Sequence, residues 1–391
     1  MTQRIFLLLT SCFLSCISLA QSQVALIPFL KGNLWGFADI NGTLKIPALY
    51  DSVSLFSADY SFSENKMTHC SVVIRNGKYG IIDEFNNILV SPIYKKMEEQ
   101  YMDANHKLFI VQDSSGKFGL LGLHDTILQP EYDLITRIES DYFLLQRNGK
   151  LGVANTQGDI IVPVAQDNIK QMSENSSEVE WKAVNASETS ILKTTPVRNR
   201  NRYGSGEVIV ESSDAFVTTG KNEKTYDYKT ELAALKAKYA VFCVGYDKNI
   251  CYCMKDGKMG YANIRNNKRI PPIYDQVQVG YVDFNENLVI VKLGGMYGLA
   301  DEDGKILAPV KYKYISVSPY KTGVFSIESS DGHYGFYFPH TGKLVHPKYL
   351  KVMEGESVYT NAQKYEEFDI MYVSDGKTSF FVGENGIEFR Q

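Results

Sequence analysis

The stretch Asn76-Gly77-Lys78-Tyr79-Gly80-Ile81-Ile82-Asp83 decides the fold, because variants of it recur along the whole chain. In the best-preserved variants an aromatic or apolar residue precedes a central Gly and another follows it. The other copies contain Trp35-Gly36-Phe37, Phe118-Gly119-Leu120, Leu151-Gly152-Val153, Met259-Gly260-Tyr261, Tyr297-Gly298-Leu299, Tyr334-Gly335-Phe336 and an eroded Thr378-Ser379-Phe380. Neighbouring copies lie 33 to 44 residues apart, except for one interval of 108 residues. A period of this size indicates a repeat architecture.

Turn signals and a proline bracket the central strand of each repeat. Asn-Gly or Asp-Gly precedes most copies, as at Asn76-Gly77, and such pairs favour two-residue hairpins. A second Gly- or Asn-containing turn follows, and then Pro with Tyr two or three residues later, as at Pro47 and Tyr50. Proline cannot donate a ladder hydrogen bond, so it should lie at a strand end or sheet edge. The pattern predicts an all-β fold of tandem three- to four-stranded antiparallel repeats of about 40 residues.

Alternation within the central strand predicts how that strand packs. Residues on either side of the Gly, such as Tyr79 and Ile81, share one face, whereas Gly152 and Ala154 share the other. We expect the face of small residues to let a neighbouring sheet approach closely.

These repeats resemble the bacterial WG-repeat family, also called KWG repeats, over residues 24–170 and 241 to the end. Repeats of that family read roughly as a Gly-Lys turn, aromatic-Gly-aromatic-x-Asp, a second Gly turn and Pro-x-Tyr-Asp. The tryptophan is kept only at Trp35. The signature positions here are Trp35, Gly36, Tyr79, Gly80, Phe118, Gly119, Gly152, Gly260, Tyr297, Gly298, Tyr334 and Gly335. The resemblance implies binding or interaction rather than catalysis, and it supplies no catalytic residue.

The arrangement of the repeats has two alternatives at this stage. Units of about 40 residues suit propeller blades, and an open solenoid-like stack is the rival. The first repeat begins one strand late and the last is expected to end in phase. No terminal sheet shared by both ends is therefore expected.

The N-terminus has the features of a signal peptide. A cationic start with Arg4 precedes an apolar run, and Ser18-Leu19-Ala20 supplies small residues for cleavage before Gln21. A lipoprotein acylated on Cys12 or Cys16 is the alternative. No later apolar run approaches about 18 residues, so no membrane span is expected. We predict a periplasmic or extracellular protein, or alternatively an outer-membrane lipoprotein.

Composition and charge limit the function. The 391 residues are 44% hydrophobic with a net charge of −4, which fits a globular protein and argues against nucleic-acid binding. The long interval lies at residues 171–240, where polar runs predict a loop and Glu231 to Tyr239 predict one short helix. The predicted organisation is a signal peptide at 1–20, repeats one to four at 21–170, this insertion at 171–240 and repeats five to eight at 241–391.

Four cysteines remain after the predicted cleavage: Cys70, Cys243, Cys251 and Cys253. A hairpin turning at Asp247-Lys248-Asn249 would place Cys243 opposite Cys253, and an exported protein favours a disulfide there. Free buried thiols are the main alternative, and a three-thiolate metal site is a minor one.

No arrangement of residues typical of an enzyme occurs, and no cofactor or metal is predicted. We therefore expect a non-enzymatic scaffold that binds an envelope protein. The alternative is a polysaccharide or small-ligand binder that uses a groove lined by the repeated tyrosines.

Overall fold

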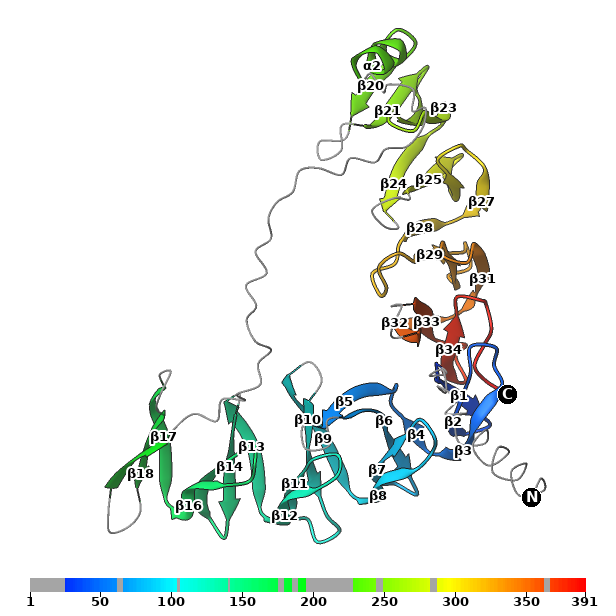
Figure 1. Cartoon of the computed structure of the whole chain (residues 1–391). Coiled ribbons are helices and arrows are strands. Elements are labelled where there is room, and N and C mark those ends of the chain that lie inside the picture. Colours follow the sequence, from blue (N-terminus) through cyan, green and yellow to red (C-terminus); the bar gives the residue numbers. More distant parts are fainter. Residues whose placement is uncertain are drawn as a thin grey trace, which may run out of the picture. The chain divides into compact units, whose positions relative to one another are not determined.

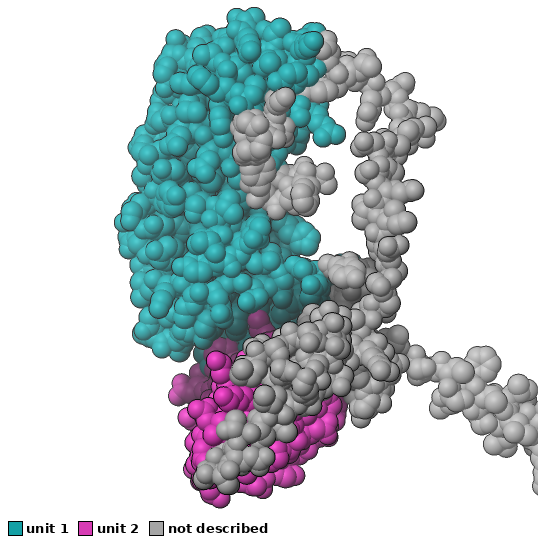
Figure 2. All heavy atoms as spheres, turned by 90° about the vertical axis from the view of Figure 1, so that its left-hand side faces the viewer, with its two compact units in different colours: residues 1–30, 37–45, 221–391 teal, residues 31–36, 46–220 magenta. Residues whose placement is uncertain are grey.

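The computed structural model describes residues 25–61, 66–103, 106–139, 141–174, 179–184, 189–194, 228–243, 249–281, 287–361 and 366–391. The chain divides into two compact units, coloured separately in Figure 2. Unit 1 comprises residues 1–30, 37–45 and 221–391, and unit 2 comprises residues 31–36 and 46–220. The predicted signal peptide and both candidate lipidation cysteines lie outside the described residues.

Small antiparallel sheets follow one another along the chain (Figure 1). A complete sheet has four strand positions in chain order, which we name a, b, c and d, and the central Gly lies in strand c. The predicted all-β fold of propeller-like antiparallel repeats is confirmed.

The first sheet is shared between the two units and lacks strand a. It contains β1 (Ile27–Lys31), β2 (Leu34–Ala38) and β3 (Leu44–Tyr50). The sheet of repeat two contains β4 (Ser52–Val53), β5 (Ser57–Ser61), β6 (Lys66–Arg75), β7 (Lys78–Asp83) and β8 (Ile88–Tyr94).

Three further sheets complete unit 2. Repeat three contains β9 (Lys96–Asp103), β10 (His106–Gln112), β11 (Phe118–Leu121) and β12 (Thr126–Tyr132). Repeat four contains β13 (Leu134–Glu139), β14 (Tyr142–Arg147), β15 (Lys150–Asn155) and β16 (Ile160–Gln166). A three-stranded sheet follows with β17 (Asn168–Glu174), β18 (Val179–Val184) and β19 (Thr189–Thr194).

The remaining elements belong to unit 1. Helix α2 (Tyr228–Lys236) precedes repeat five, which contains β20 (Ala240–Cys243), β21 (Ile250–Lys255), β22 (Lys258–Asn263) and β23 (Lys268–Tyr274). Repeat six contains β24 (Gln276–Tyr281), β25 (Asn287–Leu293), β26 (Met296–Asp301) and β27 (Ile306–Tyr312). Repeat seven contains β28 (Tyr314–Val317), β29 (Phe325–Glu328), β30 (Tyr334–Phe338) and β31 (Lys343–Tyr349). Repeat eight contains only β32 (Lys351–Asn361), β33 (Glu366–Ser374) and β34 (Ser379–Gly383).

Left-handed backbone at the turns explains the Asn-Gly and Asp-Gly pairs. Asn76 has φ of 52° and Gly77 has φ of 70°, as a two-residue turn between strands b and c requires. The turn between c and d is shaped by the acidic residue that ends strand c. Asp39 accepts backbone hydrogen bonds from Asn41 at 3.0 Å and from Thr43 at 2.9 Å.

The central glycines are required by strand d of their own sheet. A Cβ on Gly80 would lie 2.6 Å from the Val90 oxygen and 2.8 Å from the Pro92 nitrogen, both backbone atoms of β8. Strand d bulges over the glycine, because Tyr79 pairs with Tyr94 while Ile81 already pairs with Val90. The glycines therefore make room for strand d of their own sheet, whereas Ala154 and Ala300 on the same strand face pack in clusters with residues of the preceding repeat.

The three-stranded sheets without a strand d carry a different residue at the glycine position. Leu145 pairs with Gly152, and the next residue, Gln146, accepts a hydrogen bond from Asp133 N. In the β17–β19 sheet Val184 accepts the equivalent hydrogen bond, so Ala183 takes the place of Leu145 and its partner Ser190 takes the place of the Gly. In repeat eight Ser374 accepts it, so Val373 takes the place of Leu145 and its partner Phe380 takes the place of the Gly. The eighth copy therefore centres on Phe380, one residue later than the sequence suggests.

The C-terminal residues stand in for the missing strand of repeat eight and also pair with β1. Phe389 N donates to Phe381 O at 2.8 Å, while Leu30 N donates to Phe389 O at 3.0 Å and Gln391 N donates to Leu30 O at 2.8 Å. The first repeat does begin one strand late, as predicted. The last ends one strand early, however, and its C-terminal segment pairs with β1, so the expectation of no shared terminal sheet is wrong.

The polar interval also differs from its prediction. Residues 168–194 form three strands in place of the loop expected from residue 171, and Trp181 is buried edge-on against Tyr142 with ring centroids 5.2 Å apart. The short helix is confirmed as α2, whose Leu235 is buried against β21 and β22. Residues 195–227 lie outside the described part of the chain.

Candidate interaction surface

The signature residues of the repeats serve the core. Residues after the central Gly, such as Phe37, Ile81 and Tyr261, are fully buried, whereas the residues before it, Trp35, Tyr79, Phe118, Tyr297 and Tyr334, are half-buried. The recurring tyrosines of strand d are also core residues, since Tyr50, Tyr132, Tyr274, Tyr312 and Tyr349 are all buried. Burial raises the pKa of each of these tyrosines. These five repeated tyrosines therefore do not line an open groove, whereas Tyr94 of β8 is half-buried and lines the hollow described below.

The charged signature residues hold the ends of the strands together. The Asp after the tyrosine pairs with the Lys that starts strand c, as in Lys117–Asp133 at 2.6 Å and Lys258–Asp275 at 2.5 Å. The same carboxylates accept hydrogen bonds from the turn between b and c, for example Asn148 N to Asp133 at 2.6 Å. The Lys side chain and this backbone donor lower the pKa of Asp133. These exposed ion pairs order the turns and do not indicate a catalytic or metal-binding site.

Cysteine pairing differs from the prediction. The disulfide joins Cys243 to Cys251, and Cys253 is a free, buried thiol. The strand register explains this, because Cys243 pairs with Cys251 and Val241 pairs with Cys253. The predicted hairpin was centred on Lys248, one residue too late, so it placed Cys243 two residues too far along the opposite strand. Cys253 packs in the apolar cluster under α2, where burial raises the pKa of its thiol.

Within the described ranges, no group of three or more His, Cys, Asp or Glu side chains is placed to hold a metal ion. The one acidic turn that resembles part of a calcium loop, Asp301 to Gly304, is a structural turn. Asp301 accepts hydrogen bonds from Asp303 N at 3.0 Å and Lys305 N at 2.8 Å. Glu302 is buried and accepts hydrogen bonds from Tyr261, Asn263 and Asn266.

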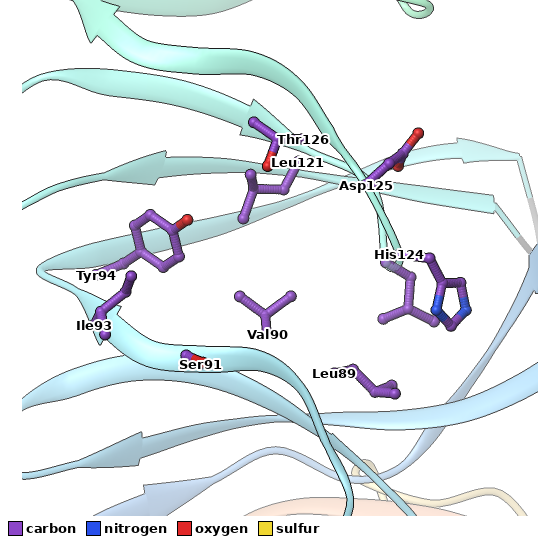
Figure 3. A pocket seen from close by; sticks show the side chains of 11 residues that line it. Leu89, Val90, Ser91, Ile93, Tyr94, Leu121, His124, Asp125 and Thr126 are labelled. Atoms are coloured by element: carbon purple, nitrogen blue, oxygen red, sulfur yellow. The ribbon is translucent and has the colours of Figure 1, made fainter.

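A shallow hollow of about 260 Å³ lies in unit 2 between strand β8 and the turn that joins β11 to β12 (Figure 3). Leu89, Val90, Ile93 and Tyr94 line it from β8. Leu121 and the turn residues Leu123 to Thr126 line it from the other side. Its walls combine aliphatic side chains with the exposed His124 and Asp125 at the turn.

Three large apolar side chains of repeat two are exposed on or beside β8. Phe85 is 58% exposed, Ile88 is 55% exposed and Ile93 is 58% exposed, and Ile93 also lines the hollow. Exposed apolar groups gathered in one repeat are typical of an interaction surface. We name Phe85, Ile88, Ile93 and the hollow the β8 surface.

The turn that carries Phe85 is fixed by hydrogen bonds. Asp83 accepts from Phe85 N at 3.0 Å and from Asn87 N at 2.7 Å. The Asn86 side chain accepts from the Tyr50 hydroxyl of β3 at 2.8 Å. An exposed aromatic ring on a turn fixed in this way loses little conformational freedom on binding.

Phe85 is also an exception among the repeats. It is the second residue after the acidic or amide residue at the start of its turn, and the corresponding residues elsewhere are Asn41, Gln157 and Asp303. Sequence analysis missed this surface because it sought what the repeats share. A comparison of repeats for apolar residues at polar turn positions would have found Phe85.

A model of the WG containing repeat matches residues 35–64, 259–297 and 297–325. The chain contains WG repeats at these three places. These matches fall on repeats one, five and six and on the strands that follow them. Among curated proteins, none matches this WG-repeat chain.

Solved structures with related folds are distant from this WG-repeat protein. A eukaryotic initiation factor is 8% identical, with a TM-score of 0.29 over 94% of this chain and 95% of that chain. AztD from Citrobacter koseri is 10% identical, with a TM-score of 0.21 over 93% and 92%. The β-propeller domain of the Trilobed protease from Pyrococcus furiosus is 13% identical, with a TM-score of 0.17 over 81% and 93%. Scores this low carry no functional argument.

In the described part of the chain, no helix has the length and apolar character needed to cross a bilayer.

Proposed function

We propose that this WG-repeat protein is a non-enzymatic, exported scaffold that binds a protein partner in the cell envelope through the β8 surface. The single observation that supports this proposal is the exposed Phe85, at a turn position where other repeats carry a polar residue, in the repeat whose strand β8 borders the hollow. Export rests on the N-terminal sequence alone.

The β8 surface suits a partner that presents an apolar side chain. The hollow is bordered by exposed Ile93 and half-buried Leu89, and its volume fits one or two side chains rather than a large cofactor. Phe85 and Ile88 add two exposed apolar side chains in the same repeat. Burial of a single exposed Phe or Ile contributes about 1.5–3 kcal/mol, so three such residues supply the central contacts of a modest interface.

The test is in-cell crosslinking of the tagged mature protein, followed by capture and mass spectrometry. The variant Phe85→Ser/Ile93→Ser is compared with the matched control Ile273→Ser, since Ile273 also precedes the strand-d tyrosine and is 52% exposed. We expect a reproducible partner to be lost with the double variant and kept with the control. Equal capture by all three proteins would contradict the proposal, provided that thermal unfolding shows each to be folded.

Polysaccharide binding is a second candidate, and one observation in unit 1 favours it. Tyr320 and Tyr359 are 44% and 52% exposed. Asp369 pairs at 3.4 Å with Lys321, the residue after Tyr320, and accepts a hydrogen bond at 2.8 Å from Ser357, two residues before Tyr359. Exposed aromatic rings near fixed polar groups can stack on sugar rings. Retention on immobilised envelope polysaccharide that is lost in Tyr320→Ala/Tyr359→Ala, and kept in Tyr101→Ala, would support this candidate.

A further inference from the structure

Strand β19 is an open sheet edge. It is the last strand of the β17–β19 sheet, and among the described residues no strand pairs with its outer side. Asp167 N donates to Val184 O at 2.6 Å, so the polar backbone groups of Val184 face β17. Val184 pairs with Thr189, and backbone groups alternate in direction along an antiparallel strand. The N–H and C=O groups of Thr189, Ile191 and Lys193 therefore face outward from the sheet.

The open edge cannot accept the bulged strand that completes the other sheets. Ser190 holds the position of the central Gly, and at Gly80 a Cβ would lie within 2.8 Å of strand-d backbone atoms. The same conflict recurs at Gly36 and Gly260. Only a straight strand can therefore add beside β19.

The d strands of the neighbouring sheets in unit 2 are protected against such addition, whereas β19 is not. Strands β8, β12 and β16 each contain a proline, at Pro92, Pro130 and Pro163. Proline has no backbone N–H to donate, so an edge strand that contains it is a poor partner for an added strand. The sequence of β19, Thr-Ser-Ile-Leu-Lys-Thr, has no proline and a single charge. Such a strand is a template for pairing with another chain.

We propose that two copies of this chain pair antiparallel through β19 and join their two sheets. In a two-fold symmetric pairing, outward-facing residues must meet outward-facing residues, and a register centred on Ile191 and its symmetry mate pairs all three of them. Residue 189 of one copy then lies opposite residue 193 of the other, and residue 190 lies opposite residue 192. This register places no like charges opposite each other, so the strand is complementary to itself. The proposal is independent of the β8 surface.

Charge substitutions at residues 189 and 193 test this register in the full mature chain. Thr189→Lys places two lysines opposite each other at both ends of the pairing, and we expect a dimer dissociation constant about 2- to 30-fold higher. Lys193→Glu alone leaves threonine opposite glutamate and should change little. The double variant Thr189→Lys/Lys193→Glu creates opposite charges at both ends and should restore dimerisation to the wild-type level or beyond.

The measurement is sedimentation equilibrium over a range of protein concentrations, with circular dichroism to confirm that each variant is folded. Concentration-dependent dimers that weaken in the first variant and recover in the double variant would support the proposal. A wild-type chain that stays monomeric at every concentration would overturn it. A dimer that none of the three charge variants alters would overturn it as well, because its interface would lie elsewhere.

Discussion

At the residue scale, the central Gly of the repeat signature lies where strand d crosses strand c. In every described sheet with a complete strand d the crossing residue is Gly, and in the two sheets without one it is Ser190 or Phe380. The glycine is therefore selected by a close backbone approach rather than by turn conformation.

Gly80→Ala should destabilise unit 2. The added Cβ would lie 2.6–2.8 Å from backbone atoms of Val90 and Pro92, which a change of rotamer cannot relieve. We expect a loss of about 2–3 kcal/mol in the free energy of unfolding, measured by urea titration with circular dichroism. The control Ser190→Ala already has a Cβ in place and should change stability by less than about 0.5 kcal/mol. Equal effects of the two substitutions would disprove the packing account.

Neutralising each of two buried glutamates by substitution should change the free energy of unfolding in opposite directions. Burial alone would raise the pKa of Glu302, but hydrogen bonds from Asn263, Tyr261 and Asn266 lower it overall. Its carboxylate thus stabilises the fold above the ordinary Glu pKa, and this contribution is lost as the pH falls through the lowered value. Burial raises the pKa of Glu384, so the ionised form of that residue opposes folding at neutral pH, and stability is gained as it protonates.

Glu302→Gln should therefore lower the free energy of unfolding at pH 7 by about 1–3 kcal/mol, while Glu384→Gln should raise it or leave it unchanged. Both differences from the wild type should shrink at acidic pH, where the native carboxyl groups become protonated. Thermal unfolding between pH 3 and pH 8 measures them. The same sign for both variants at pH 7 would be inconsistent with these pKa shifts.

At the element scale, the C-terminal segment acts as a short strand shared by the last sheet and β1. Phe389 is fully buried, and the Arg390 guanidinium lies 3.6 Å from the centroid of the Phe380 ring while pairing with Asp375 at 2.5 Å. Phe380 and Arg390 thus fill the place that a glycine and strand d occupy in the other repeats.

Deletion of residues 387–391 should open both sheet edges. We expect faster hydrogen exchange at the Leu30 amide, which donates to Phe389 O, and a loss of about 2–4 kcal/mol from removal of the buried Phe389 and its neighbours. Arg390→Ala should give a smaller effect in the same direction, and Gln391→Ala should preserve the backbone bonds. Unchanged exchange at Leu30 after the deletion would show that the segment does not hold β1.

At the scale of the whole molecule, stability comes from the apolar clusters between successive sheets rather than from covalent links. In unit 1 one of these clusters contains Val289 and Tyr261. In unit 2 one of them contains Phe143 and Leu120. The disulfide between Cys243 and Cys251 closes a loop with a sequence separation of only 8.

Reduction of the disulfide should therefore loosen β20 and leave the other sheets folded. A loop this short contributes about 2–3 kcal/mol by the loop-entropy estimate. Hydrogen exchange before and after treatment with a dithiol should change around residues 240–255, with little effect in unit 2. Peptide mapping of the oxidised protein should link Cys243 to Cys251, and Cys253→Ser should keep that link. A link between Cys243 and Cys253 would instead restore the pairing predicted from the sequence.

The sequence by itself determined the strands around each central Gly and the turns that join them, because these depend on local conformation and alternation of side chains. Only the tertiary structure decided the partner of Cys243, the strands at residues 168–194 and the contact of the C-terminal segment with β1. Each of these depends on the register between segments or on pairing across the chain, which local patterns do not encode. The β8 surface and the open edge of β19 likewise became visible only once the folded repeats showed which apolar side chains and which backbone groups remain uncovered.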